Sequence, residues 1–478
     1  MSNTIWTPQP KQLLFMQRPE YEALYGGAAG GGKSDALIIE ALRQVHIPHY
    51  KALILRKTYP QLAELIEKSL NYYKQAFPGA KYNDSKHVWT FPSGAKVIFG
   101  SMQHTKDRTN YQGQAYDYIA FDELTHFTYE EYSYLFSRNR PNGPGTRVYI
   151  RATANPGGIG HGWVKERFIT PAPPMTPIAD TVEWETPDGK KAKRTLKRIF
   201  VPSKVFDNPA LLKNNPDYIA NLASMPEAEK RALLYGDWDS FSGQVFTEWK
   251  NDSEHYEDRL YTHVINPFLI PNNWTVYCSF DWGYFAPFSA GWYAVAPDGV
   301  MYRIREFYGC NGTPNMGVRM DAQTVAQEIK RIESEDENLK RFSQIYRVGD
   351  PAIWASQGTE STGALMEREG VYFEKADNTR ISGKMQIHHR LKFDKSGRPQ
   401  FQVFNTCKHF IRTFPSLVYS ETDVEDVDTH QEDHIYDEFR YICMRNPVTR
   451  VQETATLKPY NPLDTEEQHT NYTWYSKY

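Results

Sequence analysis

The stretch GGAAGGGKS, residues 26–34, satisfies the pattern G-x-x-x-x-G-K-[ST] through Gly27, Gly32, Lys33 and Ser34. In such a loop the glycines let backbone N–H groups turn inward around phosphates, the lysine brings a positive charge to the β and γ oxygens, and the hydroxyl ligates Mg²⁺. A flexible glycine-rich turn is the alternative, but an apolar run precedes this loop and a helical pattern follows it. The stretch therefore predicts a P-loop that binds ATP and Mg²⁺. The residues expected to hold the nucleotide are Gly27, Gly30, Gly31, Gly32, Lys33 and Ser34.

Short apolar runs alternate with helical patterns on both sides of this loop. In residues 34–45, Ile38, Leu42 and Val45 recur at helical spacing, and residues 216–235 also have a helical pattern. Strands that alternate with helices predict a parallel sheet with covering helices. The first half is thus expected to be an α/β domain with a small helical subdomain near its end. The runs expected as strands are 21–25, 51–56, 96–100, 116–122 and 147–152.

Two carboxylates end the apolar run YDYIAFDEL, residues 116–124. Asp122 is expected to hold Mg²⁺ through water, and Glu123 to orient and activate the water that attacks the γ-phosphate. An apolar strand that ends in Asp-Glu is common by itself, so this interpretation depends on the P-loop upstream. In RATANP, residues 151–156, Thr153 and Asn155 could lie near the γ-phosphate and sense hydrolysis, and a simple polar strand end is the alternative.

A second set of strands begins after the stretch GDWDSFSGQVF, residues 236–246, which is rich in Gly, Ser and Asp and marks the expected boundary. Strands are expected at 274–280, 289–295, 300–307 and 345–348, with a helix at 324–332. Residues 391–393 and 401–404 flank Lys-Ser-Gly-Arg-Pro and are expected to form a hairpin. The predicted organisation is residues 1–240 for the first domain, 241–270 for a linker, 271–445 for the second domain and 446–478 for a weakly ordered tail.

Carboxylates end two strands of this second half and recur on one helical stretch. Asp281 ends VYCSFD and Asp350 ends YRVGD, while Asp433 and Asp437 lie one helical turn apart. Side chains of this charge repel one another unless a cation joins them. Oxygen ligands alone suit Mg²⁺ or Mn²⁺, and two such ions can clamp a phosphodiester. A strand-end cap or a surface charge is the alternative for any single one of these residues.

The composition of the whole chain excludes several classes of protein. Lys plus Arg number 55 against 58 Asp plus Glu, a net charge of −3, so any DNA-binding surface must be a local patch. The four cysteines form no CxxC pair, which argues against a zinc site or a disulfide framework. Neither a signal peptide nor an apolar run of membrane-spanning length is present, so a protein that is not secreted and has no membrane partner is expected.

The order of motifs in the first half resembles that of bacteriophage terminase large subunits. The motifs are Gln12, the P-loop, LRKTYPQL (55–62), the IAFDE strand and ATANPGGIGHGWVKERF (152–168). The Gln12 amide offers the donor and acceptor that an adenine edge needs. The resemblance implies that Arg56 lies near the nucleotide and that a further arginine reaches the ATP of a neighbouring subunit. Arg108 is the candidate, although Gln112 stands nearer the expected place, and Arg138 and Arg140 remain open.

The second half resembles the RNase H-like nuclease domain of the same family. The resemblance rests on the Asp-x-Gly strand, the Gly-Asp strand end and the motif H-x-x-D-x-x-R-Y, residues 434–441. It implies that Asp281, Asp350 and Asp437 are the metal ligands. Asp433 would be a supporting carboxylate, and Glu306 is a weaker candidate. A basic stretch, RISGKMQIHHRL (380–391), could hold the DNA backbone through Lys384 and its neighbours, and a solvated amphipathic helix is an equal alternative.

Together the resemblances imply a P-loop (ASCE/RecA-like) ATPase domain followed by an RNase H-like nuclease domain. Such a protein drives double-stranded DNA into a viral procapsid and cuts concatemeric DNA, with ATP, Mg²⁺ and Mn²⁺ as cofactors. The family also implies a homo-oligomeric ring, a portal protein, a small terminase subunit and a site in the host cytoplasm at the procapsid portal. A helicase-nuclease of DNA repair and a non-catalytic portal-docking component are the alternatives. Intact Lys33, Ser34, Asp122 and Glu123 argue against the second.

Overall fold

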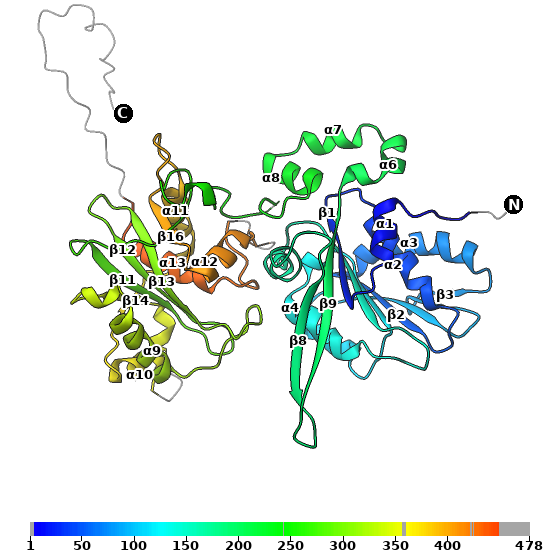
Figure 1. Cartoon of the computed structure of the whole chain (residues 1–478), viewed down its shortest axis with the longest axis horizontal. Coiled ribbons are helices and arrows are strands. Elements are labelled where there is room, and N and C mark those ends of the chain that lie inside the picture. Colours follow the sequence, from blue (N-terminus) through cyan, green and yellow to red (C-terminus); the bar gives the residue numbers. More distant parts are fainter. Residues whose placement is uncertain (1–3, 242, 356–359, 421–422, 424, 449–478) are drawn as a thin grey trace, which may run out of the picture.

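The computed structural model describes residues 4–241, 243–355, 360–420, 423 and 425–448, and the expected tail lies almost entirely outside them. Two separate β-sheets, each covered by helices, divide the chain into an N-terminal and a C-terminal half (Figure 1). This arrangement confirms the expected α/β class. No helix of the described residues is long and apolar enough to cross a membrane.

The N-terminal sheet has nine strands in the order β3-β4-β5-β2-β6-β7-β1-β9-β8. Its central strands, from β5 to β9, are parallel to one another, whereas β3-β4, β4-β5 and β8-β9 are antiparallel pairs. Strand β7 lies between β1, which leads into the P-loop, and β6, which leads into Asp122. Parallel strands end at the same edge, so this order brings both motifs together, as expected of a RecA-like domain. The strands are β1 (Glu22–Gly27), β2 (Lys51–Arg56), β3 (Lys81–Asn83), β4 (Val88–Thr90), β5 (Lys96–Ser101), β6 (Tyr118–Phe121), β7 (Tyr149–Ala154), β8 (Ile178–Glu185) and β9 (Lys191–Ser203).

Helices cover both faces of this sheet, and each face has its own apolar core. Helix α3 shows why: Leu62, Leu65, Ser69 and Tyr73 recur every three or four residues and are its buried positions. The helix expected at 34–45 ends earlier, because α2 stops at Glu40 and a 3-10 turn follows. The helices of this half are α1 (Pro10–Met16), α2 (Lys33–Glu40), α3 (Tyr59–Ala76), α4 (Tyr129–Tyr134), α5 (His161–Val164), α6 (Pro209–Asn214), α7 (Tyr218–Ala223) and α8 (Glu227–Lys230).

The short helices α6, α7 and α8 and the π turn Arg231–Tyr235 form a small cluster that packs beside the P-loop. Its core joins Val205, Leu222 and Leu234, with Ala29 of the P-loop packed against them. The Ala29 N–H also donates to the Leu233 carbonyl, at 2.8 Å. The expected helical subdomain is therefore present, and it contacts the loop directly.

A long antiparallel hairpin of β8 and β9 extends away from the sheet (Figure 1). The sequence did not predict it, because nearly all of β8 and the outer part of β9 are exposed and carry no apolar alternation. The signal that was available is the turn Pro187-Asp188-Gly189 between two runs with β-branched and aromatic residues.

The C-terminal sheet has seven strands in the order β10-β16-β13-β12-β11-β14-β15. Strands β11, β12 and β13 form an antiparallel meander, and β14 and β15 follow in parallel on the other side of β11. This order is the one expected of an RNase H-like domain: an antiparallel meander of three strands, with two parallel strands beside the first strand of the meander. The strands are β10 (Val264–Ile265), β11 (Thr275–Asp281), β12 (Ser289–Val295), β13 (Met301–Tyr308), β14 (Tyr346–Gly349), β15 (Glu374–Lys375) and β16 (Phe401–Phe404).

Within the described residues, five α-helices accompany this sheet, and α13 packs against β11, β12 and β14. They are α9 (Ala322–Glu335), α10 (Thr362–Arg368), α11 (Arg380–Leu391), α12 (Lys408–Thr413) and α13 (His434–Arg445). Two expectations are wrong here. Leu391 ends α11, and β16 pairs in parallel with β10 and β13, so the expected hairpin is reduced to one bridge between Phe393 and Pro399. The expected linker is also too long, because β10 and Ile270 already belong to the second sheet and core.

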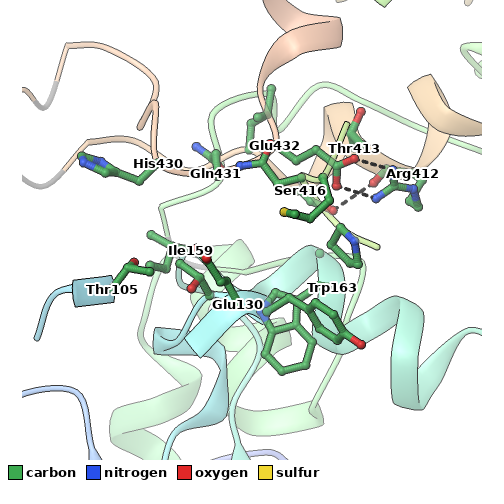
Figure 2. Close-up of a pocket in the computed structure, with 17 residues that line it drawn as sticks. Thr105, Glu130, Ile159, Trp163, Arg412, Thr413, Ser416, His430, Gln431 and Glu432 are labelled. Atoms are coloured by element: carbon green, nitrogen blue, oxygen red, sulfur yellow. Dashed lines mark hydrogen bonds and ion pairs between the residues drawn. The ribbon is translucent and has the colours of Figure 1, made fainter. Parts of the chain in front are cut away.

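The two halves contact each other where the chain passes from one to the other. Ala232 and Phe241 form a small buried apolar cluster with Val418 of the C-terminal half, and Ile159 packs against it. A cavity of about 180 Å³ lies at this junction (Figure 2). Trp163 lines it from the N-terminal half, and the ion-paired Arg412 and Glu432 line it from the C-terminal half. Neither candidate site described below lies in this cavity.

A fully buried ion pair joins α13 to the C-terminal sheet. Arg303 of β13 and Glu438 of α13 are both inaccessible to solvent and lie 2.6 Å apart, and Ser289 also donates to Glu438, at 3.2 Å. Burying two charges is tolerated only while each neutralises the other. The pair therefore fixes α13, and with it the neighbouring Asp437, against the sheet.

We expect Glu438→Ala to lower the free energy of unfolding of the C-terminal half by about 3–5 kcal/mol, because Arg303 would remain buried without its partner. Denaturant unfolding followed by tryptophan fluorescence measures this loss. Glu335→Ala is the matched control: it removes an exposed partner of Arg331 and should cost at most about 1 kcal/mol. Equal effects of the two changes would contradict the prediction.

Candidate nucleotide and metal sites

Side chains from three segments hold the carbonyl groups of the P-loop. The Tyr25 hydroxyl donates to the Gly31 carbonyl at 3.0 Å, the Asn208 amide donates to the Gly30 carbonyl at 2.7 Å, and the Gln12 amide donates to the Gly32 carbonyl at 2.7 Å. The same Gln12 amide accepts from the Gln9 N–H at 2.7 Å. Gln12 was expected to face an adenine edge, but in this structure it holds the loop. Asn208 was missed, since nothing in the sequence connects it with a loop so far upstream.

Space around the loop explains its glycines. A Cβ atom on Gly31 would overlap Ser203, and one on Gly32 would overlap the Gln12 amide. Gly32 also has φ +69°, a left-handed conformation that favours glycine. The loop can therefore take this path only with glycine at position 32, which the motif prescribes, and at position 31, which it leaves open.

Lys33 begins α2 and is almost fully buried. Its ammonium group donates to the Ala28 carbonyl within the loop. Burial lowers the pKa of Lys33 to about 8, and the nearby Asp122 and Glu123 carboxylates oppose this shift. The lowered pKa indicates that the buried Lys33 ammonium has no strong anionic partner in this structure. Phosphate oxygens would be such a partner.

At the end of β6, polar side chains from three other segments contact Asp122. The Ser34 hydroxyl donates to it at 3.0 Å, and the Arg56 guanidinium contacts it at 2.7 Å. The Thr153 hydroxyl donates to the other carboxylate oxygen. The structure thus brings together Ser34, Arg56, Asp122 and Thr153, as the sequence predicted. Ser34 and Asp122 lie side by side, as joint ligands of Mg²⁺ must.

Glu123 has a left-handed backbone, φ +58°, which is uncommon for a residue other than glycine. Its N–H donates to the Thr153 hydroxyl at 3.2 Å, and its carboxylate lies 3.3 Å from His126 and 3.8 Å from Arg56. Strained backbone of this kind often occurs at functional sites. The conformation directs a partly exposed carboxylate to the edge that carries the P-loop.

The remaining predicted residues of this half have mixed placements. The Asn155 side-chain oxygen is buried and accepts no hydrogen bond from a described residue, which leaves it available to a ligand. Arg108 pairs with Glu130 and lies over the Tyr134 ring at 5.6 Å, and Arg138 lies over the same ring. These contacts do not reach the P-loop or Asp122, so a role for Arg108 in a neighbouring subunit stays a prediction.

Carboxylates of the C-terminal half meet at the edge where β11 and β14 end. These strands are parallel neighbours, and the Asp350 N–H donates to the Phe280 carbonyl at 3.0 Å, so Asp281 and Asp350 lie side by side. Asp437 comes from α13, and Asp433 is the residue that precedes this helix. The structure thus brings together the four carboxylates that the sequence singled out.

The motif H-x-x-D-x-x-R-Y surrounds Asp281 and Asp437. His434 lies 3.5 Å from Asp281, and the Tyr441 hydroxyl donates to Asp281 at 3.3 Å. Arg440 contacts Asp437 at 2.8 Å, and Arg380 contacts it at 3.4 Å. Each motif residue therefore either bears a carboxylate or contacts one.

The electrostatics of this carboxylate cluster indicate an excess of negative charge. Burial raises the pKa of Asp281 to about 6, and repulsion from Asp437 and Asp350 adds to this shift. Burial and repulsion from Asp437 raise the pKa of Asp433 to about 8. Burial lowers the pKa of His434, but its contacts with the Asp281 carboxylate outweigh this and raise the pKa to about 8.

A divalent cation fits this cluster by the chemistry of its donors, because Mg²⁺ and Mn²⁺ prefer carboxylate oxygens and would offset the repulsion. Among the described residues, no three His, Cys, Asp or Glu side chains already surround one point as a metal site. Asp437 is turned instead to Arg440, and an Asp350 oxygen accepts from the Ala352 N–H at 3.0 Å. Rotation of these two side chains would free their oxygens.

The cation-free C-terminal half should lose stability as the pH rises from 5 to 8. Asp residues of an unfolded chain titrate near about 4 and His near about 6.5. The pKa values of Asp281, Asp433 and His434 are raised in the fold, so between these limits the folded state binds more protons than the unfolded state. The free energy of unfolding therefore falls with rising pH. Thermal unfolding in EDTA measures this, and Mn²⁺ should raise the melting temperature more at pH 8 than at pH 5. A melting temperature in EDTA that rises over this range would contradict the prediction.

The basic stretch on α11 is not a DNA-binding surface in this structure. Lys384 is buried, donates to the Glu425 carbonyl and lies over the Tyr419 ring. Arg390 is buried and donates to the Asn446 carbonyl. His388 pairs with Glu248 at 3.0 Å. These side chains hold the fold together, because the helix packs between α13 and other segments, which its sequence alone could not reveal. Glu306 also lies elsewhere, and accepts from the His409 and Phe410 N–H groups at the start of α12.

The sequence of the N-terminal half matches the model of a known family. The sequence model of the family described as terminase large subunit, T4likevirus-type, N-terminal, matches residues 24–250, which include the P-loop, Asp122 and Glu123. No curated protein sequence matches the chain.

Several solved structures resemble the chain at low identity. The large terminase of a thermophilic bacteriophage is 17% identical, with 91% of this chain and 98% of that one covered and a TM-score of 0.39. The large terminase of bacteriophage HK97 is 11% identical, with 91% and 95% covered and a TM-score of 0.43. The nuclease domain of the P22 large terminase is 18% identical, with 43% and 94% covered and a TM-score of 0.30. From the match of its sequence to the family model, the segment 24–250 belongs to the terminase large subunit family, which confirms the resemblance of the first half.

Proposed function

We propose that this chain is a DNA-packaging motor that hydrolyses ATP in its N-terminal half and cuts DNA in its C-terminal half. The observation that carries this proposal is the presence of two separate sites in one chain. One joins the P-loop to Asp122, and the other joins Asp281, Asp350 and Asp437. A P-loop with its acidic strand end suits phosphoryl transfer, and a carboxylate cluster in an RNase H-like sheet suits phosphodiester cleavage.

In the ATPase half, Lys33 would bind the β and γ phosphate oxygens, where it exchanges the Ala28 carbonyl for a stronger anionic partner. Ser34 and Asp122 would hold Mg²⁺, which neutralises phosphate charge. Glu123 would orient and deprotonate the attacking water, and the free Asn155 oxygen would accept a hydrogen bond from a water near the γ-phosphate. Arg56 would orient Asp122 through their ion pair.

In the nuclease half, Asp281, Asp350 and Asp437 would hold Mg²⁺ or Mn²⁺, with Asp433 in support, and the cation would neutralise charge on the phosphodiester. His434 and Tyr441 orient Asp281 from one side, while Arg440 orients Asp437 from the other. These contacts fix the direction in which each carboxylate presents its oxygens.

The match of residues 24–250 to the terminase family supports double-stranded DNA as the substrate, and a ring of copies, a portal protein, a small terminase subunit and a procapsid as partners in the host cytoplasm. A helicase-nuclease is less well supported. It would need a second RecA-like domain, and the described residues after 264 form the meander sheet instead.

Two assays on the purified full chain test the proposal. Plasmid DNA should be cut with Mn²⁺ or Mg²⁺ and left intact with EDTA, and ATP should be hydrolysed in a Mg²⁺-dependent reaction. Cleavage that continues in EDTA would refute the nuclease site, and absence of ATP turnover with and without DNA, procapsids and portal would refute the motor.

A further inference from the structure

An exposed aromatic pair lies on the connection between β11 and β12, directly after Asp281. Tyr284 and Phe285 stack edge to face at 5.2 Å, and Phe285 is 69% exposed, more than any other large hydrophobic side chain of the described residues. Asp281 pairs with Ser289 across the two strands, so this connection projects from the edge that carries the carboxylate cluster. Phe285 is the fourth residue after Asp281, a span of at most about 14 Å.

The backbone of this connection is firmly held, although its side chains are exposed. The Gly317 N–H donates to the Phe285 carbonyl at 2.7 Å. A Cβ atom on Gly317 would lie 2.5 Å from the carbonyl oxygens of Tyr284 and Ala286, so only glycine permits this contact. The ring of Phe285 is therefore presented to solvent by a fixed backbone, not by a loose loop that could fold it inward.

The segment that holds this connection adds a positive charge beside the ring. Arg319 lies with its guanidinium 5.3 Å from the centre of the Phe285 ring, and no described carboxylate pairs with it. Val318, next to it, is 38% exposed. Arg319 has φ +59°, a strained backbone conformation that persists only where surrounding structure imposes it. We call Tyr284, Phe285, Val318 and Arg319 the aromatic lip.

The same segment touches the carboxylate cluster. The Asn315 side-chain oxygen lies 2.9 Å from His434, whose other ring nitrogen faces Asp281 at 3.5 Å. The lip is thus anchored to the residues that orient the carboxylates. A polymer held at Asp281 would have to pass near it.

We propose that the aromatic lip binds the DNA strand that enters the carboxylate cluster, with Phe285 against a base and Arg319 on a backbone phosphate. This rests on the nuclease function proposed above. Aromatic faces accept any base, and an unpaired guanidinium suits a phosphate, so the lip matches a nucleic acid without reading its sequence. The lip also supplies the exposed basic and aromatic groups that α11 does not.

Binding of a short single-stranded DNA, whose bases are free to stack, to the full chain in EDTA tests the lip without cleavage. Phe285→Ala should weaken binding at least about fivefold, as expected for loss of one stacking contact, and Phe285→Tyr should restore it. Arg319→Gln should also weaken binding and should lower the slope of log affinity against log salt by about one. Leu269→Ala is the matched control, because Leu269 is 62% exposed and precedes the opposite end of β11.

Wild-type DNA affinity in Phe285→Ala would overturn the proposal. A change of oligomeric state in light scattering, with DNA affinity intact, would show that a second copy of the chain covers the lip instead, and would equally overturn it. The proposed nuclease function fails on a different result, namely cleavage that continues in EDTA. The two failures are therefore distinguishable.

Discussion

Asp281→Asn should abolish DNA cleavage while ATP hydrolysis continues at the wild-type rate. The change removes one negative charge from a cluster that must hold divalent cations, and Asp281 is central to it, in contact with His434 and Tyr441. Loss of residues that merely support a metal ligand costs about 10–100-fold in activity or affinity, so loss of a ligand should exceed 100-fold. Plasmid cleavage in Mn²⁺ and phosphate release from ATP, measured on the same preparation, check both halves of this expectation.

The control for this variant is Asp298→Asn. Asp298 is exposed in the turn between β12 and β13, at the opposite end of the sheet from Asp281, and should leave both activities unchanged. Substitution of an isosteric amide at Asp281 also relieves repulsion with Asp437 and Asp350, so the melting temperature in EDTA should not fall. Normal cleavage by Asp281→Asn would show that Asp281 is not a metal ligand.

Lys33→Ala and Glu123→Gln should both stop ATP hydrolysis, and only the second variant should still bind ATP. Lys33 is the buried positive charge of the P-loop, and removal of one such preorganised group costs about 10²–10³-fold in turnover. The amide in Glu123→Gln keeps the shape of the side chain but cannot accept a proton from water. Phosphate release and the binding of a fluorescent ATP analogue separate these two effects.

Lys74→Ala is the control for the P-loop variant, because Lys74 is an exposed lysine of α3. Cleavage of plasmid DNA should survive in all three variants, since the carboxylate cluster belongs to the other sheet. Wild-type turnover by Lys33→Ala would mean that the nucleotide site lies elsewhere. Equal loss of ATP binding in Glu123→Gln would point to a structural role for Glu123, with its left-handed backbone.

Much of the fold was predictable because its central strands are buried on both faces and are therefore continuous apolar runs. Strand β2 was predicted with its observed bounds, and β12 likewise. The hairpin of β8 and β9 was missed for the opposite reason: its stability comes from cross-strand pairing of exposed residues, which leaves no apolar period in the sequence.

The candidate sites were predictable where a motif fixes both residue type and position. Ser34, Asp122 and Thr153 meet as expected, and so do Asp281 and Asp350. Burial was the information that the sequence lacked. Lys384 and Arg390 have the charges of a DNA-binding helix, yet the face of α11 that carries them packs inward. Arg319 lacks any basic neighbour in sequence and becomes conspicuous only beside Phe285.

The three hydrogen bonds that hold the P-loop carbonyls have a consequence for the thermodynamics of binding. A glycine-rich loop loses more conformational entropy on ordering than any other kind of segment, and here Gln12, Tyr25 and Asn208 order it as the protein folds. The nucleotide therefore binds a loop that is already ordered, and the entropic cost of ordering the loop does not reduce its affinity. Asn208 belongs to the segment that leads into α6, so a displacement of the small helical cluster would break its hydrogen bond to the loop. The loop would then regain conformational freedom, which would favour release of the product.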